Sequence, residues 1–167
     1  YYKLDGNSND STSNGRNGTD SNVTYRGQGI YGTNTAKYAG VTSSNTVVPA
    51  LGNTIKNNFS VSFWFKSGGG GGTGQAAVTK DTLGARCWTI WTNAYSAPLT
   101  NIDFYIYNSN VGYGVTSASD YNDGNWHNVV CIFTPSTSIQ MYVDGILDGS
   151  NTTSIPATID NDAANVI

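Results

Sequence analysis

The chain has 167 residues, of which 11% are charged and 12% are aromatic, and its formal net charge is −3. All eight lysines and arginines lie in the first 86 residues, whereas residues 87–167 hold seven aspartates and no basic residue, so no single basic face for a nucleic acid is evident. No stretch has the pattern of a signal peptide or the length of a membrane span. Residues 1–167 are therefore expected to form one β-rich domain with a neutral polar surface.

The first 25 residues combine a short apolar start with a turn-rich run. Residues 1–4 look like a strand, and the Asp, Asn, Ser and Gly residues after them favour Asx turns and left-handed backbone. Asp5, Asp10 and Asp20 lie among asparagines and could supply oxygen ligands for Ca²⁺. The alternative is that these side chains cap their own loops without a metal, as Asp10 can do with the hydroxyl residues that follow it.

Alternation of apolar and polar residues predicts a series of short strands through the middle of the chain. The expected strands are 36–40, 46–51, 59–66, 76–80, 86–92 and 101–108. Residues 67–74 include five consecutive glycines and are expected to form a mobile loop. The absence of any convincing helical periodicity indicates an all-β fold.

Residues 121–150 predict a β-hairpin. The apolar runs 126–133 and 138–143 are separated by Pro135-Ser136-Thr137, which favours a turn. Asp144-Gly145 then predicts a second tight turn, because Gly accepts a positive φ without a Cβ clash. Residues 151–167 look like a polar loop that ends at the start of another strand, Asn165-Val166-Ile167.

Three residues with reactive side chains, two Cys and one His, fall inside these strand patterns. Cys87 and Cys131 belong to no metal-binding spacing; two buried thiols or one disulfide would both fit, and buried thiols are favoured. His127 is the one histidine, and no Gly-x-Ser-x-Gly motif accompanies it, so we expect a strand-edge side chain held by hydrogen bonds.

Several motifs, in this order, resemble the laminin-G-like, concanavalin A-like family in its bacterial and phage branch. They are the strand Asn58–Lys66, the run Asp123–Val130 with its Trp-His pair, and Met141-Tyr142-Val143-Asp144-Gly145, together with the opening Tyr2–Thr19. The resemblance implies an antiparallel two-sheet jelly-roll β-sandwich. In that family a segment like Asn165–Ile167 leads into a last strand that pairs with the N-terminal one. We therefore expect a domain truncated at both ends, whose open slot is filled by further residues or by a neighbouring chain.

Strand alternation also predicts a candidate binding face. If the apolar residues of the expected strands point inward, then Trp64, Trp91, Tyr105 and Tyr107 share the outer face of one sheet, with Asp103 among them. That face is concave in the resembling family. Aromatic rings flanked by oxygen acceptors suit a sugar. The alternative is that the N-terminal loop covers these rings and forms a second small core.

The absence of glutamate disfavours an enzyme. All eleven acidic residues are Asp, whereas the hydrolases of the resembling family would need a pair of catalytic Glu on one strand. Hydrolysis by the usual route needs two carboxylates roughly 5–10 Å apart, and Asp103 is alone on its strand. We expect no catalytic activity.

These features predict a non-catalytic binding or adhesion module, extracellular or on a virion surface, that binds a glycan. The alternative is a purely structural virion protein, such as a capsid decoration, fibre or tail module, whose partners are the neighbouring subunits of its assembly.

Overall fold

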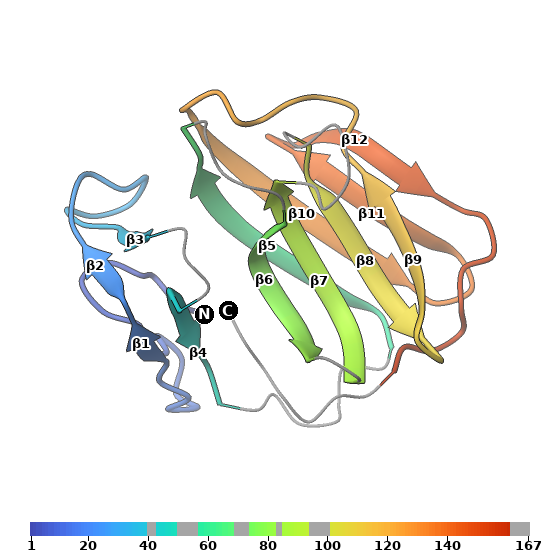
Figure 1. The fold of residues 1–167 in the computed structure, drawn as a ribbon, viewed down its shortest axis with the longest axis horizontal. Coiled ribbons are helices and arrows are strands. Elements are labelled where there is room, and N and C mark those ends of the chain that lie inside the picture. The colour runs from blue at the N-terminus through green and yellow to red at the C-terminus, as the bar shows by residue number, and fades with distance from the viewer. Residues whose placement is uncertain (40–42, 50–56, 69–73, 83–84, 94–100, 161–167) are drawn as a thin grey trace. The chain divides into compact units, whose positions relative to one another are not determined.

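The computed structural model describes residues 1–39, 43–49, 57–68, 74–82, 85–93 and 101–160. Across these residues the regular structure consists of twelve strands, and all of their pairings are antiparallel (Figure 1). The chain divides into an N-terminal unit, within residues 1–50, and a larger unit, within residues 51–164. No helix long and apolar enough to cross a membrane is found in the described part of the chain.

The N-terminal unit contains two small ribbons. β1 (Thr19–Ser21) pairs with β4 (Asn45–Val47), and β2 (Val23–Tyr25) pairs with β3 (Ala36–Tyr38). The strands expected at 36–40 and 46–51 are thus confirmed in shortened form. β4 ends before Pro49, which has no N–H for a ladder.

The predicted strand at residues 1–4 is wrong. Tyr2 forms only an isolated bridge with Asp10, and Leu4 has a φ of 53°, which is incompatible with an extended strand. A leucine in the left-handed region turns the chain immediately after Tyr2.

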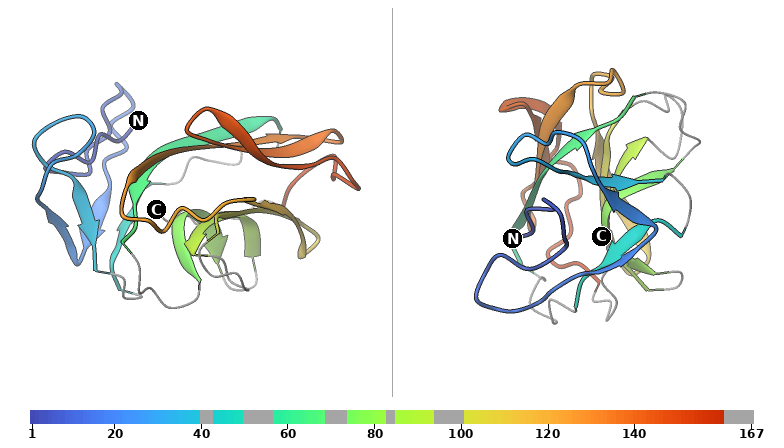
Figure 2. Two further views of the ribbon diagram at one scale, coloured as in Figure 1. Left: turned by 90° about the horizontal axis from the view of Figure 1, so that it is seen from above. Right: turned by 90° about the vertical axis from the view of Figure 1, so that its left-hand side faces the viewer.

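The larger unit is a sandwich of two four-stranded sheets, which the views in Figure 2 show as two layers. Sheet one has the order β12-β11-β10-β5, and sheet two has the order β6-β7-β8-β9. The strands are β5 (Phe59–Lys66), β6 (Gln75–Thr82), β7 (Ala85–Asn93), β8 (Asp103–Asn108), β9 (Val111–Thr116), β10 (Trp126–Thr134), β11 (Ser138–Val143) and β12 (Ile146–Asn151). The all-β, two-sheet antiparallel sandwich predicted from the sequence is confirmed.

The predicted hairpin is confirmed as β10 and β11. Their register runs from Val129 opposite Val143 to Thr134 opposite Ser138. Asp144 and Gly145 have φ values of 52° and 82°, as a type I′ hairpin turn requires, and the chain returns as β12. β12 ends at Asn151, where the polar loop was expected to begin, and residues 152–160 form no strand.

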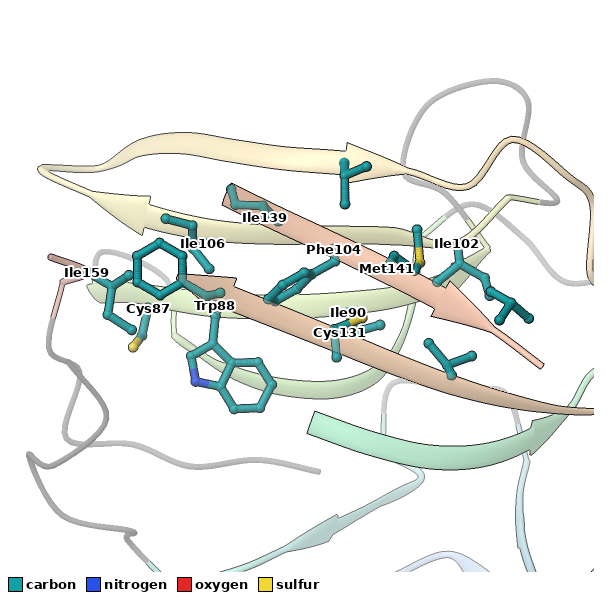
Figure 3. Packing of buried hydrophobic residues seen from close by; sticks show 14 residues of the cluster. Cys87, Trp88, Ile90, Ile102, Phe104, Ile106, Cys131, Ile139, Met141 and Ile159 are labelled. Carbon is teal, nitrogen blue, oxygen red and sulfur yellow. The ribbon is translucent and has the colours of Figure 1, made fainter. Parts of the chain in front are cut away.

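The core lies between the two sheets. Alternate residues of β10 and β11 are fully buried, and they meet inward-facing side chains of β7 and β8 (Figure 3). Phe104 and Phe133 both pack near Phe59, with ring centroids 6.2 and 5.8 Å away. Burying a side chain of this size stabilises the fold by roughly 1.5–3 kcal/mol before losses in entropy.

Both cysteines belong to this core. Cys87 and Cys131 are fully buried and form no disulfide, which agrees with the expected buried thiols. Burial raises the pKa of the Cys131 thiol, because a thiolate loses its hydration there.

The two sides of the sandwich differ. At the β9/β12 side the sheets are joined, since Asn151 Nδ2 donates to the Gly114 carbonyl at 3.0 Å. At the other side the inward-facing residues of β5 are only partly buried, and β10 is its one partner among the described strands. The strand expected to begin at Asn165–Ile167, and residues 69–73 of the expected glycine-rich loop, lie outside the described residues, so the filled slot and the mobile loop stay predictions.

Candidate functional site

Four of the five predicted ligand residues lie on the outer face of sheet two, which we call the sheet-two face. On β7 and β8, Trp88, Ile90, Phe104 and Ile106 face the core, so the residues between them face outward. The register places these outward residues in adjacent rows: Trp91 is opposite Asp103, and Thr89 is opposite Tyr105. Tyr107 follows one row further along β8.

Trp64 does not belong to this face, which corrects the sequence prediction. β5 pairs with β10 in sheet one, where Trp64 lies opposite Asn128 with 40% of its surface exposed. Alternation within β5 correctly predicts that Trp64 points away from the core. It says nothing about which of the two sheets a strand joins, and that is where the prediction failed.

Two glycines of β9 leave room for the rings of Tyr105 and Tyr107 to pack flat against the sheet. Tyr105 is opposite Gly114 and Tyr107 is opposite Gly112. A Cβ placed on Gly114 would lie 2.6 Å from Tyr105 Cδ1, and one placed on Gly112 would lie 3.1 Å from Tyr107 Cε1. The alternating Val-Gly-Tyr-Gly-Val of β9 is the sequence signal for this packing, and the alternation of apolar and polar residues alone does not reveal it.

The polar groups of the sheet-two face are deeply buried. Asp103 is 3% exposed, and its Oδ1 accepts a hydrogen bond of 2.6 Å from Thr116 Oγ1. Thr89 is fully buried, and its hydroxyl has no hydrogen-bond partner in the described part of the chain. A buried hydroxyl without a partner is costly, and this one is not open to solvent.

The aromatic groups vary in exposure. Trp91 and Tyr105 are half-buried, whereas Tyr107 is 8% exposed. Burial raises the pKa of Tyr107, and it likewise raises that of Tyr105, to which the nearby Asp103 carboxylate adds. Both phenols therefore stay protonated and can donate a hydrogen bond at neutral pH.

Arg86 lies at the Tyr107 end of the face. Its guanidinium carbon is 5.0 Å from the centre of the Tyr107 ring, and its Nη1 donates to Tyr107 Oη at 3.0 Å. The register between β6 and β7 shifts here, because Asp81 is opposite Arg86 while Lys80 is opposite Trp88. Cys87 is the extra residue of this bulge, and its side chain joins the core.

The three aspartates predicted as calcium ligands do not form one site. Asp5 accepts from the Asn34 backbone N–H at 2.9 Å, and Asp20 accepts from Thr46 Oγ1 and Tyr25 Oη. No group of three or more His, Cys, Asp or Glu side chains that could hold a metal occurs among the residues described. The carboxylate oxygens already serve as acceptors for the protein's own donors, so these three residues do not fit a shared Ca²⁺ site.

Asp10 shows most clearly the alternative in which an aspartate caps its own loop without a metal. Its Oδ1 accepts from both the backbone N–H and the hydroxyl of Thr12, at 2.9 and 2.7 Å, and its Oδ2 accepts from the Arg16 N–H. The Thr12 backbone N–H, followed by the Thr12 hydroxyl, lowers the pKa of Asp10 to about 2. This is the self-capped Asx turn.

His127 is held between two carboxylates. Its Nδ1 lies 2.8 Å from Asp144 Oδ2, and its Nε2 lies 3.0 Å from Asp123 Oδ1. Partial burial lowers the pKa of His127, but the hydrogen bonds to Asp144 and then Asp123 outweigh that effect and raise it above 6.5. The ring ties the turn after β11 to the start of β10, as expected of a strand-edge histidine held by hydrogen bonds.

The sequence matches a known family over most of its length. Residues 32–167 match the model of the concanavalin A-like lectin/glucanases superfamily, of the laminin G type. The chain belongs to this superfamily. The match includes every strand of the sandwich and confirms the resemblance seen in the sequence. No curated protein sequence matches the chain.

Solved structures share the fold at low sequence identity. The binding domain of Paraclostridial Mosquitocidal Protein 1 has a TM-score of 0.77 and 13% identity over 95% of this chain and 40% of its own. The botulinum neurotoxin serotype D ligand binding domain, in complex with N-acetylneuraminic acid, has a TM-score of 0.72 and 17% identity over 95% and 39%. Domains LG4-5 of the mouse laminin alpha1 chain have a TM-score of 0.55 and 16% identity over 72% and 30%. This chain thus spans about two fifths of the two toxin structures and less of the laminin structure.

Proposed function

We propose that this chain is a non-catalytic binding module that recognises a glycan through the sheet-two face. The observation that carries the proposal is the row of half-buried Trp91 and Tyr105 beside the Asp103 carboxylate. A pyranose ring presents an apolar C–H face and a rim of hydroxyls. The aromatic rings suit the first, and the carboxylate suits the second.

The carboxylates of this face favour binding over hydrolysis. Asp81 lies opposite Arg86, and Asp103 lies opposite Trp91, so they stand at opposite ends of the face, roughly 15 Å apart at about 3.3 Å per residue. Glycoside hydrolysis by the usual route uses two carboxylates within about 10 Å of each other. Asp103 is also engaged by Thr116, which suits a fixed acceptor for sugar hydroxyls.

An extracellular or virion-surface location is part of the proposal. Two of the similar structures are described as binding domains, one of a mosquitocidal protein and one of a neurotoxin, and the third as a pair of laminin domains. They share the fold of this chain at 13–17% identity, so they support a surface-binding role only by analogy.

A glycan array with two tryptophan variants tests the proposal. Trp91→Ala removes a ring from the sheet-two face, whereas Trp64→Ala removes an outward-facing ring from sheet one and serves as the matched control. We expect Trp91→Ala to weaken glycan binding at least about tenfold, as loss of a central aromatic anchor does. We expect Trp64→Ala to leave binding unchanged.

A second function is favoured by the burial of the same face. Tyr107 and Asp103 are less than one tenth exposed and Thr89 is fully buried, as in a second packed layer. If that layer is only structural, the chain is a rigid module of a larger assembly such as a virion. The wild-type protein would then bind no glycan on the array, and the assembly would lose integrity when the domain is deleted.

A further inference from the structure

The one basic group on the described part of the sheet-two face is Arg86. Lys80, its nearest basic neighbour on β6, is 2% exposed and lies opposite Trp88, on the core side of the sheet. The Arg86 side chain is 44% exposed, so its guanidinium reaches solvent beside the aromatic residues. The face therefore has the Arg86 cation beside the Asp81 carboxylate at one end and the Asp103 carboxylate at the other.

Tyr107 holds the guanidinium in place. The ring lies 5.0 Å from the guanidinium carbon, and the hydrogen bond to Oη uses one of the five N–H donors of Arg86. Asp81 Oδ1 is 3.9 Å from Nε, which is close enough for charge attraction but too long for a hydrogen bond. A guanidinium fixed in this way keeps donors for a further acceptor and loses little freedom when it binds one.

From this geometry we infer that the ligand is an acidic glycan, carrying a carboxylate or sulfate group that pairs with Arg86. The inference rests on the proposed function and names the chemical class of its ligand. Carboxylates and sulfates match the planar fork of arginine through paired N–H···O bonds. The sugar rings would stack on Tyr105 and Trp91, and their hydroxyls would lie near Asp103.

The ends of the face set the length of this ligand. Arg86 and Trp91 are five residues apart on β7, or roughly 15 Å at about 3.3 Å per residue. A single acidic sugar cannot span both ends, whereas a short oligosaccharide can. The charged unit would then occupy the Arg86 end, and a neutral unit would occupy the Trp91 end.

The test is an array that pairs acidic glycans with their neutral counterparts, such as galacturonan oligosaccharides with their methyl esters and sulfated with unsulfated glycans. The wild type should prefer the acidic members, and Arg86→Gln should weaken that binding at least about tenfold, since a hydrogen-bonded charge is lost. Arg86→Lys keeps the positive charge but loses the planar guanidinium fork, so its binding should be intermediate between that of the wild type and that of Arg86→Gln. Lys66→Gln removes one exposed charge from sheet one and should change nothing.

Thermal melting of each variant separates lost recognition from lost folding, because only variants that melt like the wild type are compared. Equal binding of acidic and neutral glycans, with no effect of Arg86→Gln and a loss in Trp91→Ala, overturns the acidic ligand but keeps the glycan-binding proposal. No binding of any glycan by the wild type overturns both.

Discussion

Gly114 is the position at which one added carbon changes the sheet-two face most. A Cβ there would lie 2.6 Å from Tyr105 Cδ1 and 2.8 Å from the Phe104 carbonyl oxygen, and backbone cannot move aside cheaply. We expect Gly114→Ala to destabilise the fold by about 1–3 kcal/mol through overpacking and to displace the Tyr105 ring. Urea unfolding measures the first effect, and the NMR signals of the tyrosine ring report the second.

Gly112→Ala is the matched control for that substitution. Its Cβ would lie 3.1 Å from Tyr107 Cε1, at the side of a ring that can shift by a few tenths of an ångström. The control should cost clearly less stability than Gly114→Ala. Equal costs would show that the Tyr105 ring does not lie against Gly114 as described.

His127 is expected to make the stability of the sandwich depend on pH. Its folded pKa is raised above 6.5, so its contribution is fully present below pH 6.5 and is lost as the pH rises through the folded value. The pKa of Asp123 is lowered to about 2, by the Asn125 backbone N–H and then by His127, and that of Asp144 is also lowered. The carboxylate contribution is present above pH 3.8 and is lost below it.

Protonated His127 and both of its ionised carboxylate partners, Asp123 and Asp144, are therefore present together between about pH 4 and pH 6.5. Thermal melting of the wild type and of His127→Gln from pH 4 to pH 9 measures its contribution. The gap in Tm between the two proteins should be largest within this window and should shrink as the pH rises through the folded pKa of His127. A gap that stays constant over this range would mean that the ring is not charged between its two carboxylates.

At the scale of strands, the sequence predicts which side chains point to the core better than it predicts which strands pair with each other. The apolar alternation of Phe59–Lys66 and the Asp-Gly turn after Val143 are local signals, and the structure has both where they were expected. Pairing between strands is not local. Nothing in the residues of β5 indicated that it joins β10 instead of β7 or β8, so Trp64 was assigned to the wrong sheet.

Weak strands were missed for a physical reason. β9 reads Val-Gly-Tyr-Gly-Val-Thr and β12 reads Ile-Leu-Asp-Gly-Ser-Asn, and their glycines remove side chains that would make the alternation visible. These glycines serve contacts between strands: Gly114 faces the Tyr105 ring, and a Cβ on Gly149 would lie 2.6 Å from Val115 Cγ2. Such contacts become visible only when both strands are in place.

At the scale of the whole molecule, calcium binding stays a prediction. Asp5, Asp10 and Asp20 each accept hydrogen bonds in separate loops of the N-terminal unit. A Ca²⁺ ion bound to the folded chain would raise Tm in proportion to the logarithm of its concentration. Thermal melting in millimolar Ca²⁺ and in excess chelator decides the matter, and an unchanged midpoint would remove the prediction.

The central claim is that a glycan binds the sheet-two face, and 19F NMR of 5-fluorotryptophan-labelled protein tests it most directly. The four tryptophans give separate signals that single Trp→Phe variants assign, and Trp91 is the one on that face. During titration with a glycan selected from the array, we predict that the Trp91 signal shifts while the Trp64 signal on sheet one stays in place. A shift of Trp64 with no change at Trp91 would place the ligand on the other sheet and contradict the account.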